Sequence, residues 1–405
     1  MTLPLEGFTV VSVEQAVAAP LATRQLADLG ARVIKVERVD GGDLARGYDR
    51  FVEGTGAHFV WLNRGKESLA VDLKSTAGRT LVRTLIDTAD VFVQNLAPGA
   101  AERLGLGAAE LRAGHPELVT VNLSGYGGGG PYAQRKAYDM LVQAEAGLIS
   151  ITGTADAAVK TGIPTADIAS GMYCAQAVLA ALLRRARTGE GAEIEVSMLE
   201  STFEWMGYPM YSTLHTGSQP PRMGVGHVSI APYDSYPTSD GEILIGVQSD
   251  NGWKTLMRDV FERPDLVDDP RFATNIDRVR HRAECDAVVA ELSARWTVED
   301  LSARLAEAGV PAAEIRDVDS AAAHPQLRAR DRWRRIDTPN AQVEALLPPA
   351  TFADHEAPMG PVPALGEHTR TVLADLGLDA AAVDAALTAG VVAAAVRPSP
   401  PDGGR

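Results

Sequence analysis

Two aspartates of this chain stand directly before helix-like sequence, and both are candidates for chemistry. Asp139 lies in RKAYDMLVQ and Asp167 lies in PTADIASGMY. Aspartate is favoured at a helix N-cap, so the local sequence alone favours capping by Asp167 before Ile168. Asp139 has the same expected role before Met140. The dipole and amides of a helix start also keep a carboxylate ionised, as a nucleophile or base requires, so capping and catalysis are compatible.

The other residue types that do chemistry form no recognisable site. Cys174 and Cys285 are too few for a disulfide framework, and no Cys/His cluster has zinc spacing. Both are predicted to be buried and inert. The run SGYGGGGPY is a flexible loop, but it is no dinucleotide fingerprint, because no helix opens behind it and Pro131 interrupts the chain. We therefore expect no metal and no redox cofactor.

An alternation of strand-like and helix-like segments in the first 190 residues must position these aspartates. The hydrophobic patterns predict strands at 8–13, 31–36, 68–73, 90–94 and 118–123, and helices at 21–29, 76–88 and 168–186. This alternation is typical of βαβ units and predicts a parallel sheet. Ligands of such sheets bind at the carboxyl ends of the strands.

The second half of the chain differs in pattern. From about Pro220 the sequence predicts a loop, a hairpin and then charged helices up to about Arg330, which indicates a small α+β domain. We expect a large lobe at 1–215, the small domain at 216–332, and a return segment at 333–392 that rejoins the large lobe. The tail at 393–405, which ends in AVRPSPPDGGR, is predicted to be disordered.

Composition and charge limit the partners. The chain of 405 residues has 38 Lys and Arg against 53 Asp and Glu, a formal charge of -15, which argues against general binding of nucleic acid. One anionic ligand is still possible, because a pocket's field depends on nearby charges. The sequence has no long uninterrupted apolar run and no leader pattern, so we expect a cytoplasmic enzyme that does not enter a membrane.

Five segments in order, from Val10 to Ser201, resemble the class III CoA-transferases, a family that also contains the 2-methylacyl-CoA racemases. They are VVSVEQAVAAPLATRQLADLGARVIKVER, NRGKESLAVDLKS, DVFVQNLAPGAAERLGL, LSGYGGGGPYAQRKAYD and PTADIASGMYCAQAVLAALLRRARTGEGAEIEVSMLES. Weaker similarity, SDGEILIGV and HPQLRARDRW, continues towards Arg335. The resemblance implies an α/β fold with a Rossmann-like large lobe built from both termini, a small domain, and a homodimer of interlocked rings.

The resemblance also implies the catalytic residue. The family's nucleophilic aspartate lies in a segment that matches PTADIASGMY, which selects Asp167. Its carboxylate would attack the thioester of an acyl-CoA, and the released thiolate would return to form an aspartyl-CoA thioester. An acceptor carboxylic acid would then take the CoA by the reverse steps. Coenzyme A is the acyl carrier in this chemistry, and no metal or redox cofactor is required.

One residue separates the two activities of the family. Racemases have a His-Asp pair in the segment that contains Asp139, and here Tyr138 stands at the histidine position. Tyrosine, with an ordinary pKa of about 10, is a poor base at neutral pH, so transferase chemistry is favoured over a racemase or epimerase. A third alternative is a protein that binds CoA without catalysis, in which Asp167 only caps a helix.

The resemblance places the remaining site residues around coenzyme A. Near the thioester, the nucleotide, the phosphates and the pantetheine arm these are Val17, Ala18, Arg38, Val71, Asp72, Leu73, Lys74, Asn95, Leu96, Ala97, Arg103, Lys136, Ala137, Tyr138 and Asp139. For a single Lys or Arg a solvated surface charge is the commoner role, and for Val71 or Leu73 a strand core. For Arg38 and Lys74 a binding role is favoured over a solvated surface charge, because each follows a predicted parallel strand, where ligands gather.

The acyl group is expected to be a dicarboxylate. Val17 replaces the glutamine of members similar to formyl-CoA transferase, and no later glycine-rich loop follows, so oxalate and formate are not expected. The segment RMGVGHVSIAPYDSY offers Arg222 and His227 for a second carboxylate, with an unliganded basic loop as an equal alternative. The pattern most resembles members that act on succinate, mesaconate, itaconate or citramalate.

Overall fold

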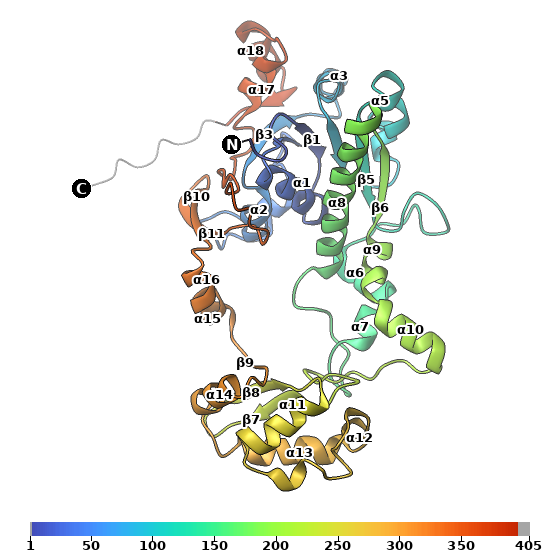
Figure 1. Ribbon diagram of the computed structural model, residues 1–405. Helices are drawn as coiled ribbons and strands as arrows, with labels where there is room; N and C mark the ends of the chain where they lie inside the picture. The colour runs from blue at the N-terminus through green and yellow to red at the C-terminus, as the bar shows by residue number, and fades with distance from the viewer. Residues whose placement is uncertain (1, 396–405) are drawn as a thin grey trace, which may run out of the picture. The chain divides into compact units, whose positions relative to one another are not determined.

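The chain folds into two compact units (Figure 1). The computed structural model describes residues 2–395, so the predicted disordered tail lies outside the described residues from 396 onward. The described part of unit 1 consists of residues 2–148, 160–208 and 331–395. Unit 2 consists of Ile149–Val159 and Pro209–Arg330. It overlaps the predicted small domain and also takes in the separate segment before residue 160.

Unit 1 is built on a seven-stranded sheet with the strand order β12-β3-β2-β1-β4-β5-β6. All neighbours are parallel except β12, which pairs antiparallel with β3. The strands are β1 (Thr9–Val13), β2 (Arg32–Glu37), β3 (Lys66–Val71), β4 (Val91–Gln94), β5 (Val119–Ser124), β6 (Glu193–Ser197) and β12 (Val392–Ala393). The prediction of an α/β fold whose parallel sheet uses both ends of the chain is confirmed.

Both faces of this sheet are buried, as expected for parallel strands covered by helices. Val10 of β1 packs into a cluster with α1 (Ala18–Asp28) and α8 (Thr165–Thr188). The next residue, Val11, faces the other way and packs with α3 (Thr76–Ile86) and with helices of the return segment. This alternation places α1 and α8 on one face of the sheet. Cys174 lies in the first cluster and is buried, as predicted.

Short elements complete unit 1. They are η1 (Leu44–Gly47), α2 (Ala57–Asn63), α4 (Ala100–Arg103), α5 (Ala108–Gly114), α6 (Asp139–Glu145), α9 (Met198–Trp205), α17 (Thr369–Asp375), α18 (Ala380–Thr388) and the hairpin β10 (Trp333–Asp337) and β11 (Gln342–Leu346). Two further helices, α7 (Leu148–Ile151) and α10 (Gly207–Thr216), contain the points where the chain passes between the units.

Unit 2 has its own core and a three-stranded antiparallel sheet in the order β7-β8-β9. Its elements are β7 (Tyr233–Pro237), β8 (Glu242–Gly246), α11 (Asp250–Thr255), η2 (Leu256–Val260), η3 (Pro264–Leu266), α12 (Asn275–Arg280), α13 (Arg282–Ser293), α14 (Val298–Glu307), β9 (Ala312–Glu314), α15 (Val318–Ala322) and α16 (Pro325–Ala329). The fully buried Trp253 and Phe272 pack in this core with ring centroids 5.6 Å apart and ring planes tilted by 57°, and the same core buries Cys285.

The helix that follows the candidate nucleophile, α8, packs directly on α1. Gly171 makes this close approach possible, because a Cβ there would lie 2.6 Å from the carbonyl oxygen of Ala18. By length and composition alone α8 could also cross a membrane, but half of its most apolar window is buried in the protein, as in the core helix of a soluble fold. The structural role of α8 is therefore to pack on α1.

We expect Gly171→Ala to lower the free energy of unfolding by about 1–3 kcal/mol, because the added methyl group has no room beside Ala18 and Leu21. Alanine is otherwise the better helix former by about 1 kcal/mol. Urea unfolding measures the change. Gly114→Ala in α5 is the matched control, since nothing lies within 4 Å of its new Cβ. Equal effects at the two positions would contradict the close-packing explanation.

Candidate active site around Asp167

Asp167 lies in the first turn of α8, and the cap of that helix is another aspartate. The helix begins at Thr165, with Pro164 at the N-cap position and no side-chain cap from that residue. Instead, Oδ1 of Asp139 accepts hydrogen bonds from the backbone N–H groups of Ala166 (2.8 Å) and Asp167 (3.3 Å). The expectation that Asp167 caps a helix starting at Ile168 is wrong, and so is the expectation that Asp139 caps its own helix. Asp139 frees the carboxylate of Asp167 from a capping role.

The carboxyl group of Asp167 is strongly perturbed. Burial, and next the negative charge of Asp139, raise the pKa of Asp167 from 3.8 to about 7. No hydrogen bond to the carboxylate from any residue among 2–395 offsets these two effects. A poorly solvated carboxylate of this kind is a stronger nucleophile than one in water, and perturbed carboxyl groups concentrate at functional sites.

Tyr48 borders this carboxyl group and was not predicted from the sequence. Its pKa is raised by burial and by the charges of Asp43, Asp167 and Tyr138. The ring follows the short turn η1 and packs edge-on against His58, with ring centroids 5.8 Å apart. No motif marks Tyr48 in the sequence, because only the folded turn brings it beside α8. Tyr138, which was predicted, is largely exposed and belongs to the same group.

A groove of about 420 Å³ lies at the carboxyl ends of β1, β2 and β3. It brings together six of the residues that were predicted to hold the nucleotide: Arg38, Val71, Asp72, Leu73, Lys74 and Leu96. Arg38 and Lys74 are exposed at its rim, where cations can meet phosphate groups. Val71 is fully buried in the sheet, so it can contribute little more than its backbone to the binding of a ligand. The carboxylates of Asp40 and Asp72 line the groove beside these two cations, and Arg38 lies 3.9 Å from Asp40. A groove with an apolar floor and two exposed cations suits a nucleotide with a thin arm.

The other predicted CoA residues lie in three places of unit 1. Val17 and Ala18 begin α1 and are buried, and Val17 packs with Ile168 beside the nucleophile. Asn95 ends β4 and exchanges two hydrogen bonds of 2.9 Å with the backbone of Gln15.

The remaining four, all from loops and short helices, are mostly exposed. Ala97 follows Asn95 in the loop after β4, and Arg103 in α4 donates a hydrogen bond to the carbonyl of Pro98 at 3.4 Å. Lys136 and Ala137 lie in the glycine-rich loop before α6. The close fit of this loop requires Gly125, because a Cβ there would meet the methyl group of Ala137 at 2.1 Å. This loop segment has two exposed cations, Lys136 and Arg135, and the guanidinium of Arg135 stacks over the ring of Tyr132 at 3.5 Å.

A fully buried charge cluster lies beneath the groove. Lys66 contacts Glu14 at 2.8 Å, and Lys35 contacts Asp43 at 2.6 Å and Glu14 at 3.4 Å. Burial would raise the pKa of Glu14, but the charges of Lys66 and Lys35 outweigh it and lower that pKa. Burial lowers the pKa of Lys66 to about 8. These residues form the wall behind the groove. No motif in the sequence predicts that they are in contact.

The two residues predicted to bind a second carboxylate lie in unit 2. The guanidinium of Arg222 donates to the backbone carbonyls of Ser150, Thr154 and Ala155, at 2.8–3.3 Å. The ring of His227 stacks on Tyr233 at 5.4 Å and its Nδ1 accepts from Ser229. In unit 2 both side chains therefore fix loops, and their predicted contact with substrate stays a prediction.

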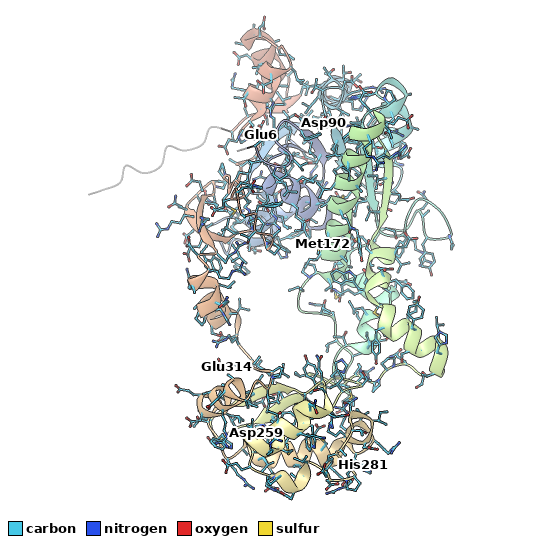
Figure 2. The ribbon with its side chains drawn as sticks, viewed as in Figure 1. Glu6, Asp90, Met172, Asp259, His281 and Glu314 are labelled. Carbon is cyan, nitrogen blue, oxygen red and sulfur yellow. The ribbon has the colours of Figure 1, made fainter. Side chains whose placement is uncertain are left out.

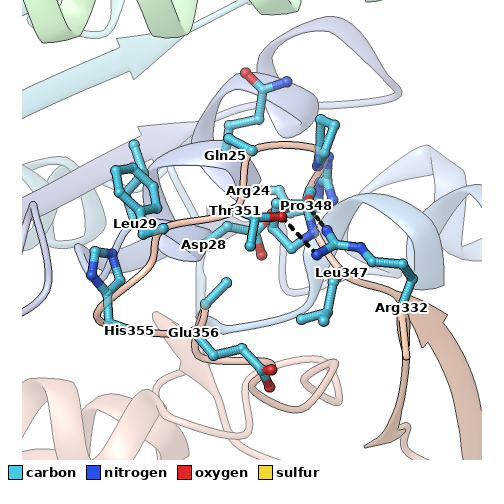
Figure 3. A pocket seen from close by; sticks show the side chains of 14 residues that line it. Arg24, Gln25, Asp28, Leu29, Arg332, Leu347, Pro348, Thr351, His355 and Glu356 are labelled. Carbon is cyan, nitrogen blue, oxygen red and sulfur yellow. Dashed lines mark hydrogen bonds and ion pairs between the residues drawn. The ribbon is translucent and has the colours of Figure 1, made fainter. Parts of the chain in front are cut away.

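Another pocket of unit 1, of about 330 Å³, lies between α1 and the segment after β11 (Figure 3). Its wall includes Arg24, which pairs with Asp28, and Arg332, which donates to Thr351 and to the carbonyl of Pro348. None of the predicted site residues lines this pocket. Among residues 2–395 no group of three or more Asp, Glu, His or Cys has the arrangement of a metal site.

Asp167→Asn should stabilise the protein at high pH. Because the folded pKa of about 7 exceeds the ordinary 3.8, the folded state binds this proton more tightly, and stability is lost as pH rises through 7. The variant cannot ionise, so at pH 8 its free energy of unfolding should exceed the wild type's by about 1–4 kcal/mol. Urea unfolding at pH 8 and pH 5 tests this. The difference should shrink at pH 5, and a variant less stable at pH 8 would contradict the raised pKa. Exposed Asp156→Asn is the control.

The comparisons with known proteins identify the family of this chain. Residues 5–369 match CoA-transferase family III. A succinate–glutarate CoA-transferase of Agrobacterium fabrum is 35% identical, over 92% of this chain and 96% of its own length. The human succinyl-CoA:glutarate CoA-transferase is 32% identical, over 96% and 90%. A crystal structure of a CAIB/BAIF family protein from Brucella suis superposes with a TM-score of 0.82 at 36% identity, covering 93% of this chain and all of that one. This chain is a member of CoA-transferase family III, an enzyme that transfers coenzyme A between acyl-CoA and carboxylic acids.

Proposed function

We propose that this enzyme transfers CoA between C4 and C5 dicarboxylic acids through a covalent thioester on Asp167. The observation that supports this most directly is the carboxyl group of Asp167 itself, which is partly buried, receives no hydrogen bond and lies at the start of α8. The groove with Arg38 and Lys74 at its rim supplies, in the same unit, a site of the right chemistry for the nucleotide of CoA.

The reaction is a sequence of four acyl transfers. A carboxylate oxygen of Asp167 attacks the thioester carbonyl of the donor, the C–S bond breaks and the thiolate leaves with its electron pair. The thiolate then attacks the aspartyl carbonyl of the mixed anhydride and releases the donor acid. The acceptor carboxylate attacks the resulting aspartyl thioester and displaces the thiolate. Finally the thiolate attacks the acyl carbon of the acceptor, and the carboxylate of Asp167 is restored.

The surroundings of Asp167 favour this cycle. Its charge is costly where burial and Asp139 raise the pKa to about 7, so forming a neutral anhydride or thioester removes an unfavourable charge. The binding of a polyanion such as CoA is served by the two exposed cations of the groove. The raised pKa keeps Tyr48 protonated, so its hydroxyl can donate a hydrogen bond to an oxygen of the reacting group.

The dicarboxylate proposal is supported by relatives. The Agrobacterium and human proteins are named for succinate and glutarate, and others 32% identical are named for mesaconate and D-citramalate. Another, 34% identical, is named for oxalate, so oxalate is the informative counter-substrate. The racemase alternative loses support at Tyr138, because a proton shuttle across the α-carbon needs a second base near neutral pH.

We also propose a homodimer. One side of α8 exposes Met172 (Figure 2), Leu179 and Leu183, which are 38–66% accessible, and Phe203 and Trp205 of α9 are 45–46% accessible. A shallow pocket of about 490 Å³ between α1 and α8 is lined by Met172, Leu179 and Trp205. Exposed apolar surface of this extent is typical of an interface, and a second copy of this chain is the proposed occupant.

Replacing the nucleophile should abolish transfer. We expect Asp167→Asn to lose about a thousandfold or more in kcat, because no other carboxylate can form the thioester. Wild-type enzyme incubated with succinyl-CoA should gain the mass of CoA on the peptide that contains Asp167, and hydroxylamine should convert this adduct to a hydroxamate. A variant with full activity, or a wild type that forms no adduct, would refute the mechanism.

Asp139→Asn is the matched comparison. Asparagine keeps an acceptor for the amides of Ala166 and Asp167 but removes the like charge, so the adduct should still form. The acid limb of its rate profile should move to lower pH than the wild type's, because the pKa of Asp167 falls.

A panel of acyl-CoA donors against succinate, glutarate, mesaconate, citramalate and oxalate, analysed by mass spectrometry, identifies the donor and acceptor acids. Deuterium uptake at the α-carbon without an acceptor would instead indicate the racemase.

The dimer is tested by mass in solution. Sedimentation should give twice the 42.9 kDa of one chain at micromolar concentration. Leu183→Glu, which places a charge on the exposed side of α8, should shift the mass towards one chain or cause aggregation, whereas exposed Asp156→Asn should not. A wild type that sediments at 42.9 kDa would refute the proposal.

A further inference from the structure

The loop between β1 and α1 is held by side chains from two other parts of unit 1. Asn95, at the end of β4, accepts the N–H of Gln15 and donates to its carbonyl, both at 2.9 Å. The N–H of the next residue, Ala16, donates to Oδ1 of Asp43 at 3.0 Å. Two successive residues before Val17, the N-cap of α1, are thus fixed by hydrogen bonds from outside the loop.

The backbone of this loop is strained at Ala16. Its φ of +65° is a left-handed conformation that a residue with a Cβ rarely adopts. Such a conformation persists only where the surroundings hold it, and it is commonest at functional sites. The backbone N–H of the strained residue itself is held by Asp43. The loop conformation therefore depends on the carboxylate of Asp43.

Asp43 has a second task in the same place. Its Oδ1 also accepts the N–H of Ala45 at 2.9 Å and so caps η1, the turn that ends at Tyr48. Its Oδ2 bonds to Nζ of Lys35 at 2.6 Å, and its own N–H donates to Glu37 at 3.0 Å. The side chain is fully buried. One rigidly held carboxylate therefore sets both the loop before α1 and the turn that carries Tyr48.

Both of these segments interact with the start of α8. Val17 packs with Ile168, the residue after Asp167, and the charge of Asp167 contributes to the raised pKa of Tyr48. Attack on a thioester requires the reacting atoms to meet at about 3–3.5 Å with the correct angle. A shift of the loop or of the turn would change what faces the carboxylate of Asp167. Gln15 and Asp43 also line the groove, but its exposed cations, Arg38 and Lys74, lie outside the loop and the turn.

We propose that Asp43 is a positioning residue for CoA transfer: it holds Ala16, and through it Val17 beside Ile168, and it caps the turn that carries Tyr48. The inference rests on the proposed function of Asp167 as nucleophile. Asp43 itself stays bonded to Lys35, Ala16 and Ala45, so it acts through the segments that it holds and not by contact with the reacting atoms.

Asp43→Asn tests the proposal. Asparagine has the same size but only one acceptor oxygen. The buried ammonium of Lys35 is the stronger donor, so this oxygen faces Lys35, and the NH₂ group cannot accept from the N–H groups of Ala16 and Ala45. We expect kcat to fall about 10- to 100-fold and the rate of CoA-adduct formation in a single turnover to fall in proportion. The dissociation constant for free CoA should change less than about threefold, because Arg38 and Lys74 keep their places although Asp43 also lines the groove. The donor and acceptor are the pair that the wild type turns over fastest in the panel.

Asp28→Asn is the matched control for lost stability. Asp28, at the other end of α1, is equally buried and is paired with Arg64 at 2.9 Å and Arg24 at 3.2 Å, away from Asp167. It should lower the unfolding midpoint but leave kcat per folded molecule unchanged. If Asp43→Asn and Asp28→Asn reduced kcat equally, or if Asp43→Asn retained the wild-type kcat, the positioning role would be overturned.

A double variant keeps the test decisive if Asp43→Asn folds poorly. Glycine adopts a φ of +65° without strain, so adding Ala16→Gly should restore the unfolding midpoint. The loop would still lack its anchor, and kcat should stay low. Recovery of kcat together with the midpoint would show that Asp43 is only structural. A wild type without a CoA adduct would instead refute the nucleophile, and thus the two proposals fail in distinguishable ways.

Discussion

The buried charge cluster behind the groove is the constraint on which unit 1 depends. Three carboxylates, Glu14, Glu37 and Asp43, meet Lys35 and Lys66 there, and Arg46 completes the balance of charge by its two bonds to Glu37. Each ion removed from water costs several kcal/mol unless its partners are placed well, and losing one partner leaves an uncompensated charge. Glu14 directly follows β1, Lys35 and Glu37 lie in β2, Lys66 begins β3, and Asp43 and Arg46 lie before and within η1, so the cluster ties these segments to one geometry.

The same constraint separates two kinds of buried carboxylate. Glu37 is satisfied by Arg46 and Ser68, which hold its pKa at about 2 against the effect of burial. The carboxylate of Asp167 has no cation or hydrogen-bond donor among residues 2–395, so burial and the charge of Asp139 raise its pKa to about 7. The satisfied carboxylates fix the backbone. The unsatisfied carboxylate of Asp167 stays costly to ionise, and this cost is the free energy that the proposed nucleophile releases when it reacts.

The sequence predicted the sheet and the groove well, because strand periodicity and the order of motifs are local signals. It placed Arg38 and Lys74 correctly at strand ends that meet. It could not assign the cap of α8, because the cap of that helix comes from Asp139, which lies 28 residues before Asp167. Tyr48 and the charge cluster were missed for the same reason: their roles arise from contacts between distant segments, and no spacing rule records such contacts.

The short strand β12 has a consequence for how the chain is made. Val392 and Ala393 pair with Val71 and Ala70, so the edge of the sheet formed by β3 has no partner until almost the whole chain has left the ribosome. An open parallel edge is a template for wrong pairing, and contacts between such distant residues form slowly. During synthesis unit 2 can already be complete while this edge is still exposed. Removing the last strand would therefore affect the yield of correctly folded protein more than its two residues suggest.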